Sequence, residues 1–300
     1  MTVLKNKILC SVLMYSTVSL LSTAHAADTL QKIKTSGKIT LGYSESSEPV
    51  SYAVAGKPLG YALDTCHNIA NEIKKELQIP NLKIEYKKVT AEQRIPEVTS
   101  GQIDLVCDTT TNTKDRQKEI GLSINYFAAE VRFAVKKDSN IKDIQDLNGK
   151  SVVTTKGTTS EKHILHIEKS KNIMLTTSYG KNHTEAFSMF ASGKVTAFLQ
   201  NESILASYIA KSPNPKDFII LGGQALAVEP YAIVFAKDDS KLKTVVDKVI
   251  LNMWTSGQMD QLYKKWFQSP IPPQNINLNM PQSQIFKYLK THPNNSGIVL

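Results

Sequence analysis

Residues 101–117, GQIDLVCDTTTNTKDRQ, constrain the fold of this chain more than any other stretch. Ile103 to Cys107 form a short apolar run suited to a buried strand. The run is followed by a cluster of hydroxyl side chains: Thr109, Thr110, Thr111 and Thr113. A short helical pattern that contains Arg116 comes next.

A strand that leads through hydroxyl residues onto a helix N-terminus presents backbone N–H groups, hydroxyl donors and a positive dipole end. Because open α/β sheets bind ligands at the carboxyl ends of strands, the stretch predicts an anion-binding position.

The first 26 residues have the pattern of a secretion signal. Lys5 and Lys7 form a basic start, residues 8–21 are apolar, and Ala24-His25-Ala26 provides an A-x-A cleavage signal. The apolar run is short for a membrane span, which leaves an uncleaved anchor as the less favoured alternative. We therefore expect cleavage after Ala26 and export of a soluble protein. The remaining chain is long enough for one large or two medium domains.

The basic residues are spread along the chain, which carries a formal net charge of +9. Nucleic-acid binding would require a run or stripe of basic residues, and the sequence contains none, so we expect no nucleic-acid partner. Arginine occurs only as Arg94, Arg116 and Arg132, whereas every other basic residue is lysine. An arginine in such a chain is favoured where a planar, bidentate donor is needed, although drift explains any single one equally well.

Two cysteines, Cys66 and Cys107, remain after the predicted cleavage. An exported protein meets an oxidising compartment, so a disulfide between them is permitted. Two buried free thiols explain the sequence equally well. The first long helix and the central strand are expected to bring the two side chains close together.

Strands and helices alternate along the first half of the chain. Strands are predicted at residues 38–42, 82–89 and 103–107, with a helix from Asp64 between the first two and a short helix near Arg94. Such β-α-β order with short connections predicts a parallel sheet flanked by helices.

A second unit repeats the same order. A strand at residues 151–155 leads through Thr158 and Thr159 into a helix that begins at Glu161, and a further strand is predicted at residues 195–199. The longest helix is predicted to begin near Ser240, with one apolar face: Leu242, Val245, Val246, Val249, Ile250, Met253 and Trp254. A helix at residues 258–267 follows it. The tail from Ser269 onward is rich in Pro and Asn and is expected to lie over the surface.

Extended segments near residues 130–133 and 231–234 are expected to connect the two units as a hinge. The predicted fold is therefore α/β with two lobes and two crossover strands, and a ligand would lie between the lobes. We expect the first lobe to comprise residues 27–130 and 235–280 and the second lobe residues 131–234. Residues 281–300 form the C-terminal tail.

Five segments together are similar to one known family. They are GYSESSEPVSY (42–52), QRIPEVTSGQIDLVCDTTTNTKDRQ (93–117), KSVVTTKGTTSE (150–161), GKNHTEAFSMFASGKVTAF (180–198) and WFQSPIPP (266–273). In these segments the chain resembles the periplasmic solute-binding proteins of polar amino-acid ABC importers, and within them the glutamate/aspartate-binding group. The resemblance implies the two-lobed, type II (Venus-flytrap) periplasmic-binding-protein fold. It also implies a binding protein without a cofactor, which closes on an amino acid and docks transiently, as a monomer, on a membrane permease.

The resemblance also implies roles for individual residues. Arg116 matches the arginine that holds the ligand α-carboxylate, and Arg94 matches an arginine that holds the side-chain carboxylate of an acidic ligand. His183 matches a histidine that lines the same pocket. The residues expected to assist Arg116 carry hydroxyl groups on both lobes: Thr109, Thr111, Thr158 and Thr159. These roles agree with the chemistry of the residues, because arginine is the bidentate carboxylate donor and helix N-termini favour anions.

Two positions depart from the family pattern. Ser44 occupies a position where the acidic-ligand binders have a second arginine, and Asn201 occupies one where most amino-acid binders have an aspartate for the α-ammonium. An amide oxygen accepts a hydrogen bond from an ammonium group but does not neutralise its charge. Glu202, the next residue, is the alternative partner for the ammonium. Glutamate or aspartate is the favoured ligand, with glutamine or a dicarboxylate that lacks the amine as alternatives.

Other functions are compatible with parts of the sequence. The chain also resembles periplasmic cyclohexadienyl dehydratases, in which a carboxylic acid in the cleft protonates a leaving hydroxyl group, and Glu202 would be that acid. A module that feeds a chemoreceptor or contacts host molecules would be compatible with transport. His163 and His166 are spaced to share a metal ion, but no further ligand is evident, so no metal site is expected.

Overall fold

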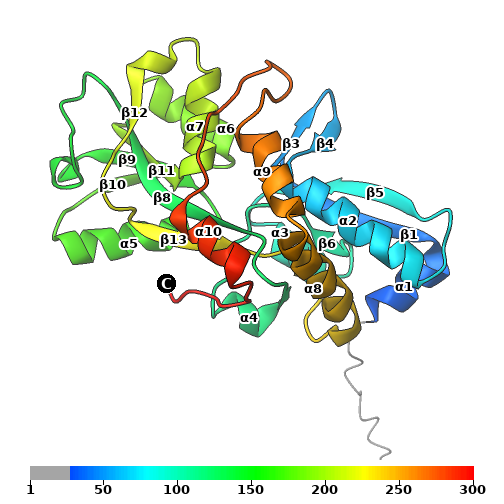
Figure 1. Cartoon of the computed structure of the whole chain (residues 1–300). Coiled ribbons are helices and arrows are strands. Elements are labelled where there is room, and N and C mark those ends of the chain that lie inside the picture. Colours follow the sequence, from blue (N-terminus) through cyan, green and yellow to red (C-terminus); the bar gives the residue numbers. More distant parts are fainter. Residues whose placement is uncertain (1–27) are drawn as a thin grey trace, which may run out of the picture.

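A computed structural model of the chain describes residues 28–300, and the predicted secretion signal lies outside these residues. Two sheets form its frame, one on each side of the molecule (Figure 1). The first has the strand order β5-β1-β6-β14-β7. Its strands are β1 (Lys38–Tyr43), β5 (Lys83–Lys88), β6 (Leu105–Val106), β7 (Gly121–Leu122) and β14 (Val234–Phe235). β1 pairs in parallel with β5 and β6, as the sequence predicts, whereas β14 is antiparallel to β6 and β7.

The second sheet has the order β10-β9-β11-β8-β12, and β13 pairs with β8 beyond this path. Its strands are β8 (Phe127–Lys136), β9 (Ser151–Thr155), β10 (Thr176–Gly180), β11 (Ala197–Asn201), β12 (Phe218–Ile220) and β13 (Ala227–Tyr231). β9 is parallel to β10 and β11, and β8 is antiparallel to its neighbours. A small third sheet follows β1 and consists of β2 (Ser46–Ser47), β3 (Ser51–Val54) and β4 (Lys57–Leu59).

Helices cover both sheets. With the first sheet lie α1 (Thr29–Ser36), α2 (Tyr61–Glu76), α3 (Arg94–Thr99), α8 (Ser240–Thr255) and α9 (Gln258–Phe267). With the second lie α5 (Ser160–Lys171), α6 (His183–Ala191) and α7 (Glu202–Lys211). The shorter elements are α4 (Arg116–Glu119) and the 3-10 helices η1 (Gln145–Leu147) and η2 (Pro215–Asp217). No helix within residues 28–300 combines the length and apolar character that crossing a membrane requires.

The helix α8 shows how the pattern of apolar residues determines packing. The seven apolar residues that predict one face of this helix are all buried, and α8 packs against α2. Asp239 caps the helix by accepting a hydrogen bond from the backbone N–H of Leu242. The chain therefore returns to the first sheet after forming the second, as predicted.

The chain crosses between the sheets twice. It passes from β7 in the first sheet to β8 in the second, and it returns between β13 and β14. Residues 127–129 of β8 belong to the apolar core around α2 and α8, whereas Val131, Phe133 and Val135 belong to the core of the second sheet. The fold is therefore α/β with two lobes joined by two crossover strands. We call the first sheet with its helices the first lobe and the second sheet with its helices the second lobe.

The tail lies over the surface but contains a helix that the sequence analysis did not predict. Residues 284–291 form α10, which lies across β8 and β13 in the middle of the molecule and buries Phe286 and Leu289 (Figure 1). The last residues are held as well, because Lys114 N donates to Ile298 O (2.8 Å) and Ile298 N donates to Asn112 O (3.0 Å). The Pro- and Asn-rich composition hides a short amphipathic helix, whose apolar residues pack over the crossover strands.

Candidate ligand-binding site between the lobes

A cavity of about 800 Å3 lies between the two lobes. Its walls come from loops at the carboxyl ends of β1, β6 and β9 and from the start of α6. Four of the residues that the sequence analysis assigns to a ligand line this cavity: Ser44, Arg94, Thr109 and His183. Strand ends from both sheets therefore meet at one polar cavity, which is the place where open α/β folds bind small molecules.

Arg94 is buried at the start of α3 and is held in a fixed orientation. Its Nε donates to Ala91 O (3.2 Å) and its Nη1 donates to Thr110 Oγ1 (3.1 Å). Nη1 also lies 3.4 Å from Asp108 Oδ2. Within residues 28–300 the Nη2 group makes no hydrogen bond, so it is the part of the guanidinium that remains for an anion in the cavity.

Asp108 is a site residue that the sequence analysis missed. Its carboxylate is buried, lines the cavity and faces Arg94, so it offsets part of the positive charge there. Its position directly after Cys107 at the end of β6 was the available signal, because strand ends of this kind carry the ligand-binding residues.

His183 is the first residue of α6 and is buried at the cavity wall. Its Nδ1 lies 2.7 Å from Thr155 Oγ1 and 3.3 Å from Gln200 Nε2. Burial, together with the positive charge of Arg94, lowers the pKa of His183 to about 3. The imidazole is therefore uncharged at neutral pH, and it can contribute hydrogen bonds but not charge to the cavity.

Arg116 begins the short helix α4, is half-buried, and lies outside the lining of the cavity. Its Nη1 donates to Thr111 O (2.9 Å), and its backbone N–H donates to Thr113 Oγ1 (3.1 Å). Burial and the positive charge of Arg94 lower the pKa of Arg116 to about 10, while Glu229 acts in the opposite sense. Arg116 is therefore still charged at neutral pH, two to three pH units below this value.

A group of polar side chains beside Arg116 joins the two lobes. Thr111 Oγ1 of the first lobe lies 3.2 Å from Thr159 Oγ1 of the second lobe. Thr159 caps α5, and the preceding Thr158 is turned back, with its hydroxyl donating to Thr155 O (2.7 Å). Asn201, at the end of β11, donates from Nδ2 to Glu229 Oε2 (2.8 Å). The residues expected to hold the amino-acid backbone thus lie together, next to the cavity.

Glu229 is a second residue of this group that the sequence analysis missed. It lies on β13, is fully buried, and accepts hydrogen bonds from Thr111 Oγ1 (3.1 Å) and Asn201 Nδ2 (2.8 Å) on one oxygen. Its other oxygen lies 2.9 Å from His163 Nε2. Burial alone raises the pKa of Glu229, but hydrogen bonds from His163, Thr159 and Asn201 and the charge of His163 hold it below its ordinary value. Glu229 is therefore ionised at neutral pH.

Further contacts hold the lobes against each other around the cavity. Tyr208 Oη donates to Ser46 O (3.0 Å), and Lys211 Nζ lies 2.5 Å from Glu48 Oε2. Gly157 of the second lobe approaches Glu92 of the first so closely that an added Cβ would lie 2.5 Å from Glu92 Cγ. The structure is therefore a closed form, in which the facing loops touch.

The sequence left open whether the two cysteines form a disulfide or remain free thiols, and the structure contains the disulfide. Cys66 of α2 and Cys107, directly after β6, are joined with their Cα atoms 6.2 Å apart. The bond ties α2 to the strand end that carries Asp108 and Thr109. It is therefore part of the support of the cavity.

Comparison with known proteins identifies the family. Residues 39–269 match the bacterial extracellular solute-binding proteins, family 3. The chain belongs to this family. Among its relatives, the L-glutamate/L-aspartate-binding protein of Pseudomonas aeruginosa is 41% identical over 281 residues, which are 92% of this chain and 93% of the relative. The glutamate/aspartate import solute-binding protein of Escherichia coli is 35% identical over 274 residues, or 91% and 90% of the two chains.

Solved structures agree with this assignment. An ancestral arginine-binding protein bound to arginine is 31% identical, with a TM-score of 0.68 over 77% of this chain and 98% of that chain. An ancestral amino acid-binding protein that is a precursor of cyclohexadienyl dehydratase is 27% identical, with a TM-score of 0.69 over 79% of this chain and 99% of that chain. The fold is thus that of the type II periplasmic amino-acid-binding proteins, as predicted.

One predicted residue of this solute-binding protein needs correction. Glu202 does not reach the cavity or the group around Asn201, because its carboxylate points to Arg132 and lies 3.7 Å from Arg132 Nε. Asn201 ends β11 and Glu202 begins α7, so the two neighbours project in different directions. Glu202 therefore offers neither a partner for a ligand ammonium nor an acid for a dehydratase reaction in the cavity.

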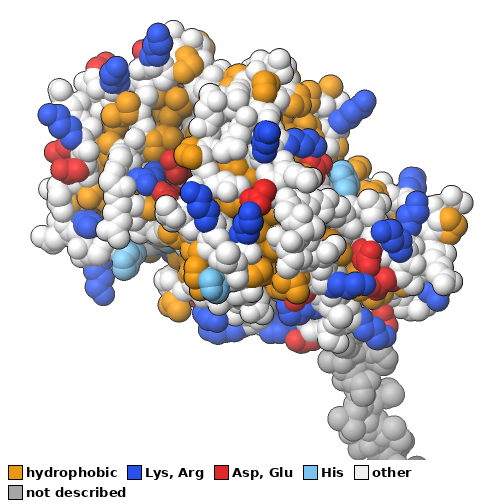
Figure 2. All heavy atoms as spheres, in the orientation of Figure 1, with side chains coloured by type: hydrophobic (Ala, Val, Ile, Leu, Met, Phe, Trp, Pro, Cys, Tyr) orange, Lys and Arg blue, Asp and Glu red, His pale blue; other side chains and the backbone are white. Residues whose placement is uncertain are grey.

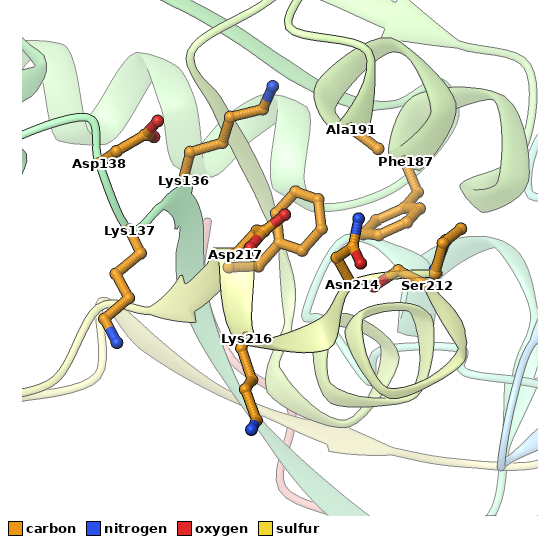
Figure 3. Close-up of a pocket in the computed structure, with 11 residues that line it drawn as sticks. Lys136, Lys137, Asp138, Phe187, Ala191, Ser212, Asn214, Lys216 and Asp217 are labelled. Carbon is orange, nitrogen blue, oxygen red and sulfur yellow. The ribbon is translucent and has the colours of Figure 1, made fainter.

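A second cavity, of about 590 Å3, lies in the second lobe away from the site. Figure 3 shows the Phe187 ring on one side of it and the side chains of Lys137 and Lys216 directed away from the ring. None of the residues predicted to hold a ligand lines this cavity. His166 lines a further cavity without His163, and residues 28–300 contain no group of three or more His, Cys, Asp or Glu side chains arranged to hold a metal.

Proposed function

We propose that this solute-binding protein captures a small acidic or polar amino acid, with glutamate or aspartate favoured, and delivers it to an ABC importer. The observation that carries the proposal is the pair of arginines, the buried Arg94 and the half-buried Arg116, which bond neighbouring residues of the hydroxyl cluster, Thr110 and Thr111. One guanidinium group in the wall of a polar cavity and a second one beside it suit a ligand with two carboxylates. The relatives named for glutamate and aspartate support the same ligand class.

Each residue receives a role in this proposal. Arg116 holds the α-carboxylate, assisted by the hydroxyl groups of Thr109, Thr111 and Thr159, while Thr158 supports the loop by donating its hydroxyl to Thr155 O. Arg94 holds the side-chain carboxylate through its Nη2 group, and His183 and Ser44 add neutral hydrogen bonds. No covalent step, cofactor or metal is part of the proposal. Ligand contacts made by both lobes exist only in the closed form, so binding shifts the equilibrium towards closure.

The proposed cellular setting is the periplasm. The closed form would dock transiently, as a monomer, on a membrane permease, and the cleaved secretion signal would end at Ala26. The two lobes would comprise residues 27–130 with 235–280, and 131–234, with residues 281–300 as the tail. Lys and Arg side chains are scattered over the face in Figure 2 and form no stripe, which supports the absence of a nucleic-acid partner.

Calorimetry on the purified protein tests this function. We expect L-glutamate or L-aspartate to bind, Arg116→Ala to abolish binding, and Arg94→Ala to weaken acidic ligands more than glutamine. Arg132→Ala is the matched control, because Arg132 contacts Glu130 (2.6 Å) outside the cavity and should leave affinity unchanged. Unchanged affinity for glutamate and aspartate in both site variants would reject the proposal. Native mass spectrometry of freshly purified protein would identify a retained ligand independently.

A further inference from the structure

Glu229 is a buried carboxylate at the junction of the two lobes. Its oxygens contact one residue of the first lobe, Thr111, and two of the second, Asn201 and His163. It lies on β13, one of the two crossover strands, and is fully buried. A carboxylate offers about four acceptor positions, and Thr111, Asn201 and His163 lie within hydrogen-bond distance of its oxygens, with Thr159 beside them, 3.2 Å from Thr111 Oγ1.

The surroundings of Glu229 suit one particular donor. Arg116 donates to the backbone oxygen of Thr111, while Glu229 accepts from the hydroxyl of the same residue. A cationic group and an anionic group therefore flank one residue. An α-amino acid carries an ammonium and a carboxylate on one carbon, so its two charges require an opposite charge of each sign at this close spacing.

A second observation comes from the same strand. Tyr231 lies two residues after Glu229 on β13, so the two side chains project from the same face of the strand. The Tyr231 hydroxyl is fully buried and makes no hydrogen bond within residues 28–300. Burial and the negative charge of Glu229 raise the pKa of Tyr231 well above its ordinary value, so the hydroxyl keeps its proton.

We propose that Glu229 neutralises the α-ammonium of the bound amino acid and thereby replaces the aspartate whose position Asn201 occupies. The inference rests on the proposed function and adds the residue that selects amino acids over dicarboxylates without an amine. Asn201 is neutral, and it orients Glu229 through its amide at 2.8 Å. The other nearby carboxylates are engaged elsewhere, because Asp108 faces Arg94 and Glu202 faces Arg132.

The deciding experiment compares L-glutamate with glutarate, the same dicarboxylate without the ammonium, by calorimetry. In Glu229→Gln we expect glutamate affinity to fall about 30-fold or more, since truncating one partner of a buried charge pair costs at least that much. Glutarate affinity should stay within threefold of the wild-type value. Glu202→Gln is the matched control: it makes the same substitution beside Asn201, on a carboxylate that points away, and should change neither affinity.

Moving the carboxylate from Glu229 to position 201 provides a second test, which does not depend on Glu229→Gln alone. Asn201→Asp places a second carboxylate next to Glu229 and should weaken glutamate binding about tenfold or more, because the two like charges repel in a buried site. The double variant Glu229→Gln with Asn201→Asp moves the single carboxylate by one hydrogen bond and should recover glutamate affinity. If Glu229→Gln fails to fold, as judged by thermal unfolding, the glutamate affinity of Asn201→Asp decides whether the inference holds.

The possible outcomes separate the inference from the function. An equal loss of glutamate and glutarate in Glu229→Gln would show a purely structural role and overturn the inference alone. A gain in glutamate affinity in Asn201→Asp would also overturn it. If glutamine proves to be the ligand, the affinities for glutamine and for glutaramate, the same molecule without the ammonium, are compared in the same way. A wild-type protein that binds no amino acid would reject the function and the inference together.

Discussion

The hydroxyl of Thr111 lies 3.2 Å from the hydroxyl of Thr159, and this contact joins the loop after β6 in one lobe to the start of α5 in the other. Both hydroxyls belong to the strand-to-helix loops that the sequence marks as anion sites. Their meeting means that a ligand held by one loop is also within reach of the other. Contacts shared in this way favour the closed form over the open one, which is how a binding protein converts affinity into a change of shape.

Asp108 should determine how strongly the site prefers an acidic side chain over an amide. Its carboxylate lies 3.4 Å from Arg94 and offsets the charge that would attract a ligand carboxylate. We expect Asp108→Asn to raise the affinity ratio of glutamate to glutamine about tenfold, since each 1.4 kcal/mol of charge interaction changes affinity by this factor. Calorimetry with both amino acids measures the ratio. A ratio that stays the same or falls would mean that Asp108 does not act on the ligand through Arg94.

His183 should make the folded protein sensitive to acid. Its pKa of about 3 in the folded state lies below its ordinary value of 6.5, so below pH 6.5 only the unfolded chain takes up this proton. The free energy of unfolding should therefore fall as the pH decreases from 6.5 towards 3, by about 2 kcal/mol at pH 5, and be unaffected above 6.5.

Urea unfolding at pH 7.5 and pH 5 measures this loss. The comparison variant is His183→Asn, in which the loss between the two pH values should be smaller by the same amount, whatever its stability at pH 7.5. The other histidines titrate alike in both proteins, so the difference isolates His183. Glu229, whose pKa is held below its ordinary 4.5, should add its own loss only below about pH 4.5, where the unfolded chain takes up this proton before the folded protein does. Parallel pH profiles in the two proteins would contradict the proposed burial of His183.

Much of the fold is predictable because its signals are local. The apolar spacing from Leu242 to Trp254 and the alternation of strands and helices require only neighbouring residues, and both lobes follow from them. Other elements differ in detail: β6 comprises only Leu105–Val106, although Cys107 N also donates to Gly42 O of the neighbouring β1. The small β2–β4 sheet was not predicted at all.

The site was predictable only in part, for a different reason. The pocket roles expected for Arg94 and His183 come from the family resemblance, and both residues line the cavity. Glu229 could not be identified, because its partners lie 28 to 118 residues away in sequence and nothing nearby marks its carboxylate as buried. The helix in the tail was missed for the same reason, since Phe286 becomes a core residue only once β8 is in place.

The Cys66–Cys107 disulfide should stabilise the protein by limiting the unfolded chain. The two cysteines are 41 residues apart in sequence, and closing a loop of this length contributes about 4 kcal/mol in the chain-entropy account. We expect the double variant Cys66→Ala with Cys107→Ala to lose about this free energy of unfolding in urea. Reduced wild-type protein should behave likewise, and a mass shift on thiol labelling after reduction confirms the bond. An unchanged urea midpoint after complete reduction would show that the bond contributes nothing.

The helix α10 should be required for stability, contrary to what the composition of the tail suggests. Phe286 is 1% exposed, and its ring lies 4.5 Å from that of Tyr263 and 5.1 Å from that of Trp254, measured between centroids. Removing such a side chain leaves a cavity in the core, so Phe286→Ala should lower the free energy of unfolding by about 3–5 kcal/mol.

Tyr288, on the same helix, provides the matched control for this prediction. It is 51% exposed, so Tyr288→Ala should change the free energy of unfolding by less than about 1 kcal/mol. Because the residues after α10 bond to Asn112 and Lys114, Phe286→Ala should also weaken ligand binding through the neighbouring Arg116, even at temperatures where the protein remains folded. Equal unfolding curves for the two variants would mean that α10 is not part of the core. Reduced stability with unchanged ligand affinity would mean that the tail does not position the loop that carries Arg116.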